Sequence, residues 1–475
     1  MQGAEFSTTN PATGRAIDTY TAMTGQQVAE IVGRAQRAFP EWKKDYERRR
    51  GYIYNLVEYL RSHKEKLARV ATAEMGKVIK ESIGEIEKCA WVLEFYADHG
   101  DSFIANEVLN TDARKSFVTF EPLGTIGSIM PWNFPYWQAL RFAAPCLMAG
   151  NVIVMKPASI TPQSGIEIET AFRESGMPDG AFQCVIGSTE TANHLIDSEG
   201  VNAVTFTGSA SAGAKVGQRA AAGLKKCVLE LGGSDPFVVL DDAIVDDAAQ
   251  GAVKGRFINC GQSCVASKRF FVQKGVAEEF TEKFLSMASK LVVGDPMNMN
   301  TDLGPVSSRA GLESISEMVE DARAKGADVL LGGEACGGGN AADDEPDGGY
   351  FYKPTVISGV TQDMMIAREE TFGPVAPITI VENEGEAVRL ANDSEYGLGA
   401  SIWTRDLSKA EKISHRIESG IVSVNNVVVS DPRVPFGGIK HSGFGRELSR
   451  YGMLEFVNVK SVRFYDNLTQ QHYVE

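Results

Sequence analysis

The sequence predicts an α/β protein built on a parallel, doubly wound sheet. In the middle of the chain, short runs of β-branched and aromatic residues alternate with helix-like segments, and the turns between them are short. Strands are expected at 152–155, 182–186, 203–206 and 237–240, and helices at 162–176, 190–198 and 211–223. Parallel strands joined by crossover helices produce this alternation, and ligands bind at the carboxyl ends of such strands.

The flanking segments show other periodicities. Apolar residues recur at helical spacing across 25–100, so this region is predicted to be helical. The remaining expected elements are a strand–turn–strand at 6–20, extended chain at 116–129, helices near 276–290 and 308–325, and a Gly- and acid-rich surface loop at 332–349. The alternating stretch 454–466 predicts an edge strand, which could contact another subunit.

Composition limits the possible functions. The 475 residues suggest two to three domains, and the net charge of −15 argues against nucleic-acid and anionic-membrane partners. Seven scattered cysteines without framework spacing indicate a reducing compartment. We see no signal peptide and no run of about 18 apolar residues, so a cytoplasmic protein with no membrane partner is expected.

Cys264 is the candidate nucleophile. It lies in Ile258-Asn-Cys-Gly-Gln-Ser-Cys-Val-Ala-Ser267, where glycine and small residues predict an exposed turn that runs into a helix. A helix N-terminus would favour the thiolate, which is the reactive form of cysteine. The alternative is an inert core cysteine, because free cysteines are among the most buried residue types.

Pro131-Trp-Asn-Phe-Pro135 predicts a rigid turn before a helix, since proline suits the first helical position. Asn133, Trp137 and Arg141 follow at four-residue spacing, which brings them towards one face. Asn133 could donate to a developing oxyanion, and Arg141 could hold an anionic group. The alternatives are a helix cap for Asn133 and a surface charge for Arg141.

Two segments at strand ends suit a dinucleotide. Lys156 follows a predicted strand and could meet a hydroxyl or a phosphate at the edge of the sheet. Ser159 leaves this neighbourhood without an acidic side chain that would repel a 2′-phosphate, which favours NADP over NAD. Gly208 and Ser209 follow another strand, and Ser209 is the expected N-cap of a helix whose N-terminus could face a pyrophosphate.

Glu230 lies in an apolar strand before two glycines, where a raised pKa would suit a general base; a salt-bridged structural glutamate is the alternative. The segment Glu369-Glu-Thr-Phe-Gly-Pro374 could hold a ribose and flank a nicotinamide. The glycine-rich segment 435–446 would let backbone run close to a site. The chain has no complete P-loop, no Gly-x-Gly-x-x-Gly at a strand-to-helix turn and no metal-binding motif.

Together these segments resemble the aldehyde dehydrogenase superfamily, from Asn10-Pro-Ala-Thr-Gly14 to the C-terminus. Seven motifs occur in the family's order: Pro131–Pro135, Lys156–Ser159, Phe206–Ser209, Glu230–Gly233, Gly261–Cys264, Glu370–Gly373 and Pro435–Gly438. The resemblance implies homodimers or homotetramers of a three-part chain. Its parts are a Rossmann-like cofactor domain (1–111 and 129–232), an α/β catalytic domain (233–447) and a small β oligomerisation arm (112–128 and 448–475).

The resemblance also implies a mechanism. Cys264 attacks an aldehyde carbon, while the Asn133 side-chain amide and the Cys264 backbone N–H hold the oxyanion. Hydride passes to NADP or NAD, and Glu230 activates the water that hydrolyses the thioester. The residues expected to bind the cofactor are Trp132, Lys156, Ser159, Gly208, Ser209, Leu231, Glu370 and Phe372.

Within the superfamily, the chain is most similar to succinate-semialdehyde dehydrogenases. This similarity lies in Trp137–Arg141, Lys156–Ser159 and Val429–Gly438. It implies that Arg141 and Ser430, beside Trp137, hold the carboxylate of the substrate. The residues Val427–Val429 depart from the more polar or small residues expected there, and they would narrow or dry the substrate tunnel.

Other functions stay open at this stage. The substrate could be a neutral or phosphorylated aldehyde, and a cysteine esterase or acyltransferase would use Cys264 without a cofactor. A non-catalytic relative is a further alternative. Intact Asn133, Glu230 and Cys264 argue against the non-catalytic relative, and Lys156 and Glu370 argue against a cofactor-free hydrolase.

Cys260 lies four residues before Cys264. Under oxidising conditions the two thiols could form a disulfide that protects the nucleophile. A buried small residue is the favoured interpretation of Cys260.

Overall fold

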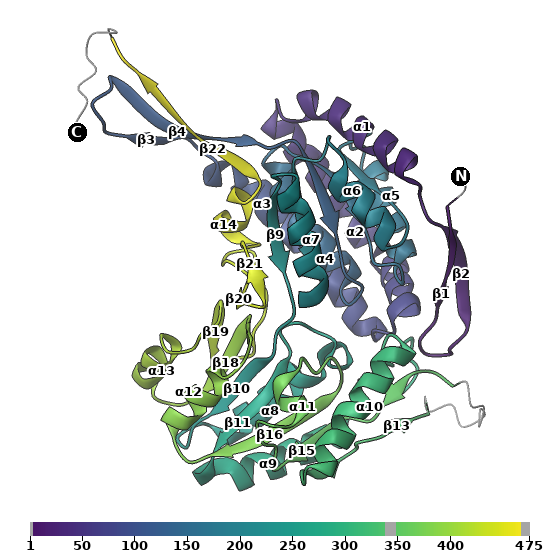
Figure 1. The fold of residues 1–475 in the computed structure, drawn as a ribbon, viewed down its shortest axis with the longest axis vertical. Helices are drawn as coiled ribbons and strands as arrows, with labels where there is room; N and C mark the ends of the chain where they lie inside the picture. The colour runs from purple at the N-terminus through teal and green to yellow at the C-terminus, as the bar shows by residue number, and fades with distance from the viewer. Residues whose placement is uncertain (1–2, 338–347, 467–475) are drawn as a thin grey trace.

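The structure, a computed structural model, describes residues 3–337 and 348–466 and consists of two α/β lobes and a projecting β arm (Figure 1). A six-stranded sheet forms the first lobe, a seven-stranded sheet the second and a three-stranded sheet the arm. Of the predicted loop at 332–349, residues 338–347 lie outside the described residues, and β13 (Ala335–Cys336) occupies part of the remainder.

The first lobe contains the predicted doubly wound parallel sheet, but the strand predicted at 237–240 belongs to the sheet of the second lobe. Its strand order is β21-β9-β8-β5-β6-β7, so the chain winds outwards from β5 in both directions. Strands β5 to β9 are mutually parallel, and β21 adds an antiparallel edge. The strands are β5 (Thr125–Ile129), β6 (Val152–Lys156), β7 (Phe182–Cys184), β8 (Ala203–Thr207), β9 (Lys226–Glu230) and β21 (Gly443–Phe444).

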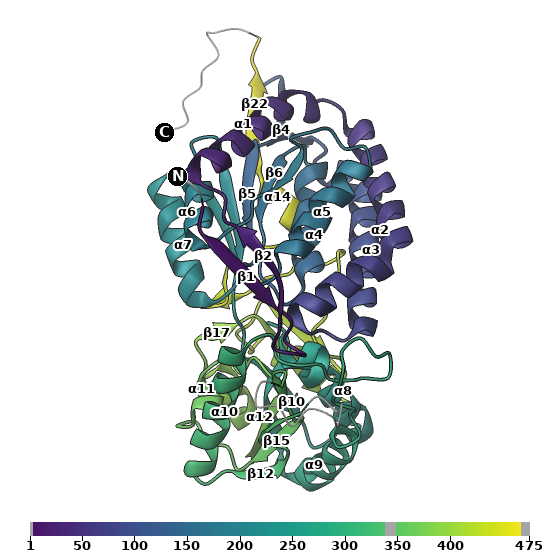
Figure 2. The same cartoon turned by 90° about the vertical axis from the view of Figure 1, so that its right-hand side faces the viewer.

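Helices cover both faces of this sheet (Figure 2). They are α1 (Gly25–Trp42), α2 (Tyr46–Met75), α3 (Ile79–Phe103), α4 (Pro135–Met148), α5 (Pro162–Glu174), α6 (Thr189–Asp197) and α7 (Ala210–Ala222). Every residue of α4 is buried, because this helix packs against α2, α3 and strand β6. Pro135 opens α4 and Ser209 caps α7, as the sequence predicted.

The seven-stranded sheet of the second lobe has the order β12-β15-β16-β11-β10-β18-β19, and only β12 is antiparallel. Phe237 and Val239 of β10 enter one apolar core, while Val238 enters another, because successive strand residues point to opposite faces. Its strands are β10 (Asp235–Val239), β11 (Ser267–Gln273), β12 (Asp328–Leu331), β15 (Thr355–Ser358), β16 (Val375–Val381), β18 (Gly399–Trp403) and β19 (Ile421–Val424).

Helices cover both faces of this sheet. They are α8 (Val245–Phe257), α9 (Lys274–Ala288), α10 (Arg309–Ala324), α11 (Met365–Arg368), α12 (Glu384–Asn392) and α13 (Leu407–Ser414). Three short strands complete the lobe: β14 (Phe351–Tyr352), β17 (Tyr396–Gly397) and β20 (Ile439–Lys440). The helices predicted near 276–290 and 308–325 are confirmed as α9 and α10.

The hairpin β1 (Glu5–Thr9) and β2 (Ala16–Thr21) runs from the first lobe towards the second (Figure 2). The arm consists of β3 (Glu107–Leu109), β4 (Lys115–Pro122) and β22 (Val457–Phe464), and α14 (Ser449–Leu454) leads into β22. Within the described chain β22 pairs with β4 alone, which confirms the predicted edge strand. No helix of the described residues is both long and apolar enough to cross a bilayer.

Candidate active site

Cys264 lies in a turn between a 3-10 helix (Ile258–Gly261) and β11, so the predicted turn-to-helix junction is wrong. The aromatic and β-branched residues after Cys264 form a strand in the middle of the second sheet. The thiol is half-buried rather than exposed, and burial raises its pKa to about 11, although Lys268 and Arg141 act in the opposite direction. The expected stabilisation of the thiolate by a helix N-terminus is therefore also wrong.

The turn before Cys264 has an unusual backbone. Asn259, Cys260 and Gly261 are consecutive residues with φ values of 50°, 53° and 74°, a region that costs non-glycine residues free energy. The Asn259 side chain offsets part of this cost, because its Nδ2 donates to the carbonyl of Asn133 at 2.8 Å and to that of Gln262 at 3.1 Å. These bonds stabilise the left-handed turn before Cys264.

Asn133 is not the helix cap, since Phe134 occupies that position of α4. Its Nδ2 donates to the carbonyl of Gln262 at 3.1 Å, two residues before Cys264. An amide nitrogen carries two hydrogens, so this bond uses one and leaves the other available. The structure thus brings Asn133 to the cysteine turn.

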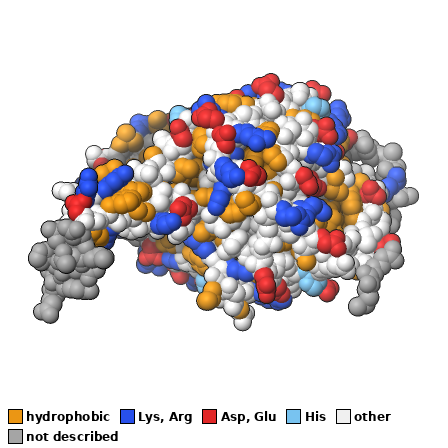
Figure 3. All heavy atoms as spheres, turned by 90° about the horizontal axis from the view of Figure 1, so that it is seen from above, with side chains coloured by type: hydrophobic (Ala, Val, Ile, Leu, Met, Phe, Trp, Pro, Cys, Tyr) orange, Lys and Arg blue, Asp and Glu red, His pale blue; other side chains and the backbone are white. Residues whose placement is uncertain are grey.

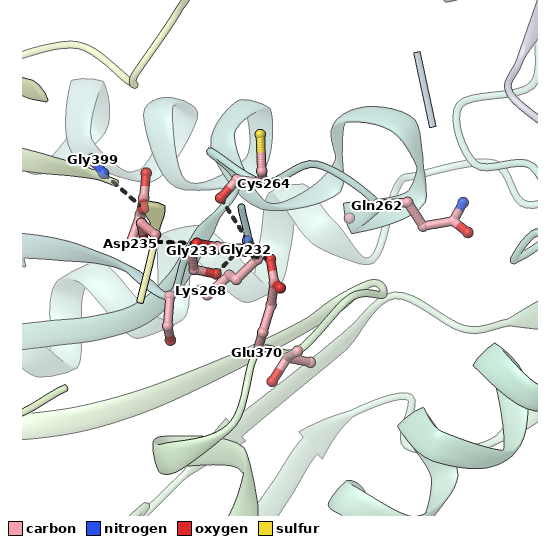
Figure 4. Close-up of polar contacts among 12 residues, drawn as sticks. Gly232, Gly233, Asp235, Gln262, Cys264, Lys268, Glu370 and Gly399 are labelled. Carbon is pink, nitrogen blue, oxygen red and sulfur yellow. Dashed lines mark hydrogen bonds and ion pairs between the residues drawn. The ribbon is translucent and has the colours of Figure 1, made fainter. Parts of the chain in front are cut away.

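Two buried cations, which the sequence analysis missed, connect this turn to the rest of the site by hydrogen bonds. Arg256 is fully buried and donates to carbonyls of Gly261 at 2.8 Å and Gly373 at 2.6 Å. Lys268 Nζ bonds the carbonyls of Gly233 and Cys264, both at 2.7 Å, and Glu370 Oε1 at 2.9 Å (Figure 4). A pair of adjacent cations, Lys268 and Arg269, at the start of an otherwise apolar strand was the sequence signal for Lys268.

Glu230 ends β9 and is 2% exposed. Both carboxylate oxygens lack a hydrogen-bond partner in the described chain, and Glu230 forms no ion pair there, so the salt-bridged alternative is excluded. Burial raises its pKa well above the usual value, and the charge of Glu447 acts in the same direction. A Cβ on Gly437 would lie 2.7 Å from Glu230 Oε1, which explains why the glycine-rich segment can approach so closely.

A cavity of about 260 Å³ opens beside the thiol. Cys264, Trp137, Arg141 and Ser430 all line it, so the structure brings the predicted substrate residues together. The three valines Val427–Val429 also line the cavity and give it an apolar wall, as their departure from the family pattern suggested. Such a wall favours a short hydrocarbon chain.

Arg141 is buried rather than a surface charge. Its guanidinium forms an ion pair with the buried carboxylate of Glu447 and lies 4.5 Å from the ring centroid of Phe436. Its Nη2 has no hydrogen-bond partner among the described residues. Arg141 therefore retains a free donor at the cavity, but Glu447 offsets its charge.

The predicted cofactor residues occupy two neighbouring places. Trp132, Glu370 and Phe372 border a second cavity of about 90 Å³, where the two rings meet edge to face at 5.7 Å. The others follow the carboxyl ends of adjacent parallel strands, where a doubly wound sheet binds ligands: Lys156 and Ser159 at β6, Gly208 and Ser209 at β8, and Leu231 at β9.

These residues suit a dinucleotide. Lys156 is 6% exposed, its pKa is lowered to about 8 by burial, and its ammonium has no hydrogen bond or ion pair within the described chain. Ser159 is exposed beside it. Ser209 caps α7 by accepting from the N–H of Ala212 at 3.3 Å, and the helix start is open to solvent.

Cys260 is 4% exposed and packs in the core of the second lobe, in agreement with the favoured interpretation. All seven cysteines are free thiols in the structure. Among residues 3–337 and 348–466, no group of three or more His, Cys, Asp or Glu side chains could hold a metal ion.

The raised pKa of Cys264 predicts slow alkylation of the ligand-free protein. Between pH 6 and 9 the rate of modification by iodoacetamide, followed by mass spectrometry of the Cys264 peptide, should rise about tenfold per pH unit, because only the thiolate reacts. The Cys264→Ala variant controls for the other thiols. A plateau below pH 9 would show that the thiolate is already formed in the resting site.

Comparisons with known proteins agree with this geometry. Residues 1–462 match the model of the aldehyde dehydrogenase family. A probable NADP(+)-type succinate-semialdehyde dehydrogenase from Synechocystis is 45% identical over 458 residues, which cover 96% of this chain and 99% of the relative. An NADP(+)-type succinate-semialdehyde dehydrogenase of Mycobacterium tuberculosis is 40% identical over 461 residues, with coverage of 96% and 99%.

Solved structures give the same result. The succinic semialdehyde dehydrogenase of Streptococcus pyogenes, solved in complex with NADP+, superposes with a TM-score of 0.93 at 36% identity and covers 97% of this chain and 100% of its own. The succinate-semialdehyde dehydrogenase of Burkholderia pseudomallei superposes with a TM-score of 0.92 at 36% identity, with coverage of 97% and 94%. The chain therefore belongs to the aldehyde dehydrogenase family, as its seven motifs predicted.

Proposed function

We propose that this enzyme oxidises succinic semialdehyde to succinate with NADP. The observation that carries the proposal is a single cavity lined by the thiol of Cys264 and by Arg141 and Ser430, which can receive a carboxylate. The names of the relatives described above support the same substrate and cofactor. A neutral aldehyde would make no use of an anion site between an arginine and a serine.

In the first half-reaction the sulfur of Cys264 forms a bond to the aldehyde carbon, and the carbonyl oxygen becomes an oxyanion. The free N–H of the Asn133 amide and the backbone N–H of Cys264 hold this oxygen. One such donor is typically worth about 2.7–4 kcal/mol. Because the resting thiol has a raised pKa, its proton must leave as the substrate binds or as the carbon–sulfur bond forms.

NADP, when bound, would supply the hydride acceptor for this oxidation. We assign Lys156 and Ser159 to the adenosine ribose, Gly208 and Ser209 to the pyrophosphate, and Trp132, Leu231, Glu370 and Phe372 to the nicotinamide half. The unpaired ammonium of Lys156 supports the first assignment. Lys268 supports the Glu370 assignment, because it holds that carboxylate at the border of the second cavity.

In the second half-reaction Glu230 removes a proton from the water that attacks the thioester. Its raised pKa makes the carboxylate a strong enough base for this step. The carboxylate oxygens of Glu230, which have no partner in the described chain, can accept a hydrogen bond from this water. Glu447 keeps the pKa of Glu230 high through its charge, while Arg141 compensates Glu447 itself.

The remaining assignments concern assembly and location. We assign residues 1–111 and 129–232 to the cofactor domain, 233–447 to the catalytic domain, and 112–128 with 448–475 to the arm. Three strands depart from these bounds, because β5 and β21 belong to the first sheet and β3 belongs to the sheet of the arm. Exposed apolar side chains on the arm support a homodimer or homotetramer (Figure 3): Val108, Leu109, Val459 and Phe464. The free thiols support a cytoplasmic setting.

The substrate assignment is tested by comparing two four-carbon aldehydes. Initial rates of NADPH formation should give a kcat/KM at least about tenfold higher for succinic semialdehyde than for butyraldehyde. Arg141→Met should remove most of this advantage, since one charge-assisted hydrogen bond is worth about 1.5–3 kcal/mol. Equal values for the two aldehydes in the parent enzyme would contradict the proposal and indicate a broad-specificity dehydrogenase.

The role of Glu230 predicts that its removal slows the steady-state phase of NADPH formation but not the initial burst. Glu230→Gln should still form the thioester and should release about one equivalent of NADPH per site in a rapid burst. The steady-state rate should then fall about 10²- to 10⁴-fold, the usual contribution of a general base. Stopped-flow absorbance at 340 nm separates the two phases. A parallel loss of burst and steady state would assign Glu230 to the first half-reaction instead.

The cofactor preference is tested at Ser159. Ser159→Glu should lower kcat/KM for NADP about tenfold or more, because a carboxylate would repel the 2′-phosphate, and should leave the value for NAD within about threefold. Ser159→Gln is the matched uncharged control. Equal losses with both cofactors would place Ser159 away from the 2′ position.

A further inference from the structure

Helix α3 presents one side to the substrate cavity. Glu81, Gly84, Glu85 and Lys88 line it, and their spacing of three and four residues places them on one helical face. Lys88 is the only cation of this group, and it comes from a helix that none of the seven sequence motifs includes.

The ammonium of Lys88 lies among the residues already assigned to the carboxylate. Its Nζ donates to Ser430 Oγ at 2.7 Å and lies 4.3 Å from the ring centroid of Trp137. An ammonium has three hydrogens, and the bond to Ser430 uses one. The other two are available to a ligand in the cavity.

The charges around the cavity make Lys88 distinct from Arg141. Glu447 pairs with Arg141, and the carboxylate of Glu85 pairs with buried Lys77. In the described chain no carboxylate lies within ion-pair distance of Lys88 Nζ, and Asp431 nearby is paired with Arg433 at 2.5 Å. Lys88 therefore contributes a positive charge that the protein itself does not neutralise.

We propose that Lys88 is a specificity-determining residue, and that its ammonium binds the distal carboxylate of the substrate together with Ser430 and Arg141. The inference rests on the proposed function and assigns a buried cation to the substrate carboxylate, whereas Lys254, which also lines the cavity, is exposed. Arg141 alone would bring its partner Glu447, which repels an anion, to the same end of the cavity. Lys88 overcomes that repulsion.

The environment of the free ammonium is consistent with this role. Burial lowers the pKa of Lys88 to about 8, and the charge of Arg141 acts in the same direction. A carboxylate bound between the two cations would favour the charged ammonium and raise the pKa of Lys88 again. An anionic ligand would thus supply the negative charge that Lys88 lacks in the described chain.

The test compares Lys88→Met with the parent enzyme on two aldehydes. For succinic semialdehyde we expect KM to rise about 10- to 100-fold, the range of one charge-assisted hydrogen bond, with kcat within about threefold. For butyraldehyde, kcat/KM should stay within about threefold or rise, because no carboxylate is lost. Lys88→Arg should recover part of the semialdehyde affinity, which a purely structural role would not predict.

A second measurement does not need turnover of the semialdehyde. Succinate should inhibit butyraldehyde oxidation competitively, and its inhibition constant should rise about 10- to 100-fold in Lys88→Met. The matched control is Lys64→Met, which removes an exposed lysine paired with Glu87 at 2.5 Å outside the cavity. It should change neither the succinate constant nor the KM for the semialdehyde.

The outcomes separate the two proposals. If the parent enzyme does not prefer the semialdehyde, the proposed function fails. If the parent does prefer it and Lys88→Met keeps the same preference and the same succinate constant, the inference about Lys88 is wrong and the function stands. Equal losses on both aldehydes in Lys88→Met and Lys88→Arg would assign Lys88 to the packing of Ser430 and would also overturn the inference.

Discussion

The active site depends on backbone carbonyls held by two buried cations. Arg256 and Lys268 extend from neighbouring elements of the second lobe and bond the cysteine turn on one side and the Glu370 segment on the other. A carbonyl buried without a partner costs about 1–3 kcal/mol, so each cation offsets several such costs at once. The left-handed residues before Cys264 persist because this network fixes both ends of the turn.

The same burial that fixes the geometry also sets the chemistry. Desolvation is the largest influence on both Cys264 and Glu230, and it raises both pKa values. In the ligand-free site, burial therefore shifts both groups towards their neutral forms. Positive charge and hydrogen-bond donors become effective only when substrate and cofactor exclude the remaining water, since electrostatic interactions strengthen in a less polar medium.

The sequence predicted much of the fold because each strand and helix carries its own periodicity. It also predicted which segments meet, through the rule that ligands bind at the carboxyl ends of parallel strands. It misplaced Cys264, because small residues after a glycine suit a helix start as well as a turn, and only the pairing of Ser267–Gln273 within the sheet decides between them. It missed Lys88 and Arg256 because a helical cation looks the same in sequence whether it faces solvent or a cavity.

Substrate selection in this family of sites is a problem of net charge as much as of hydrogen-bond geometry. Burial raises the pKa of Glu230, the proposed general base, and the charge of Glu447 acts in the same direction. The buried carboxylate of Glu447 in turn requires a cation, and Arg141 supplies it. The positive charge of Arg141 is therefore partly neutralised before a substrate binds. An anionic substrate then needs a further positive charge, and the buried ammonium of Lys88, which pairs with no carboxylate of the described chain, adds one to the cavity. Base strength and anion affinity are thus coupled through one buried ion pair.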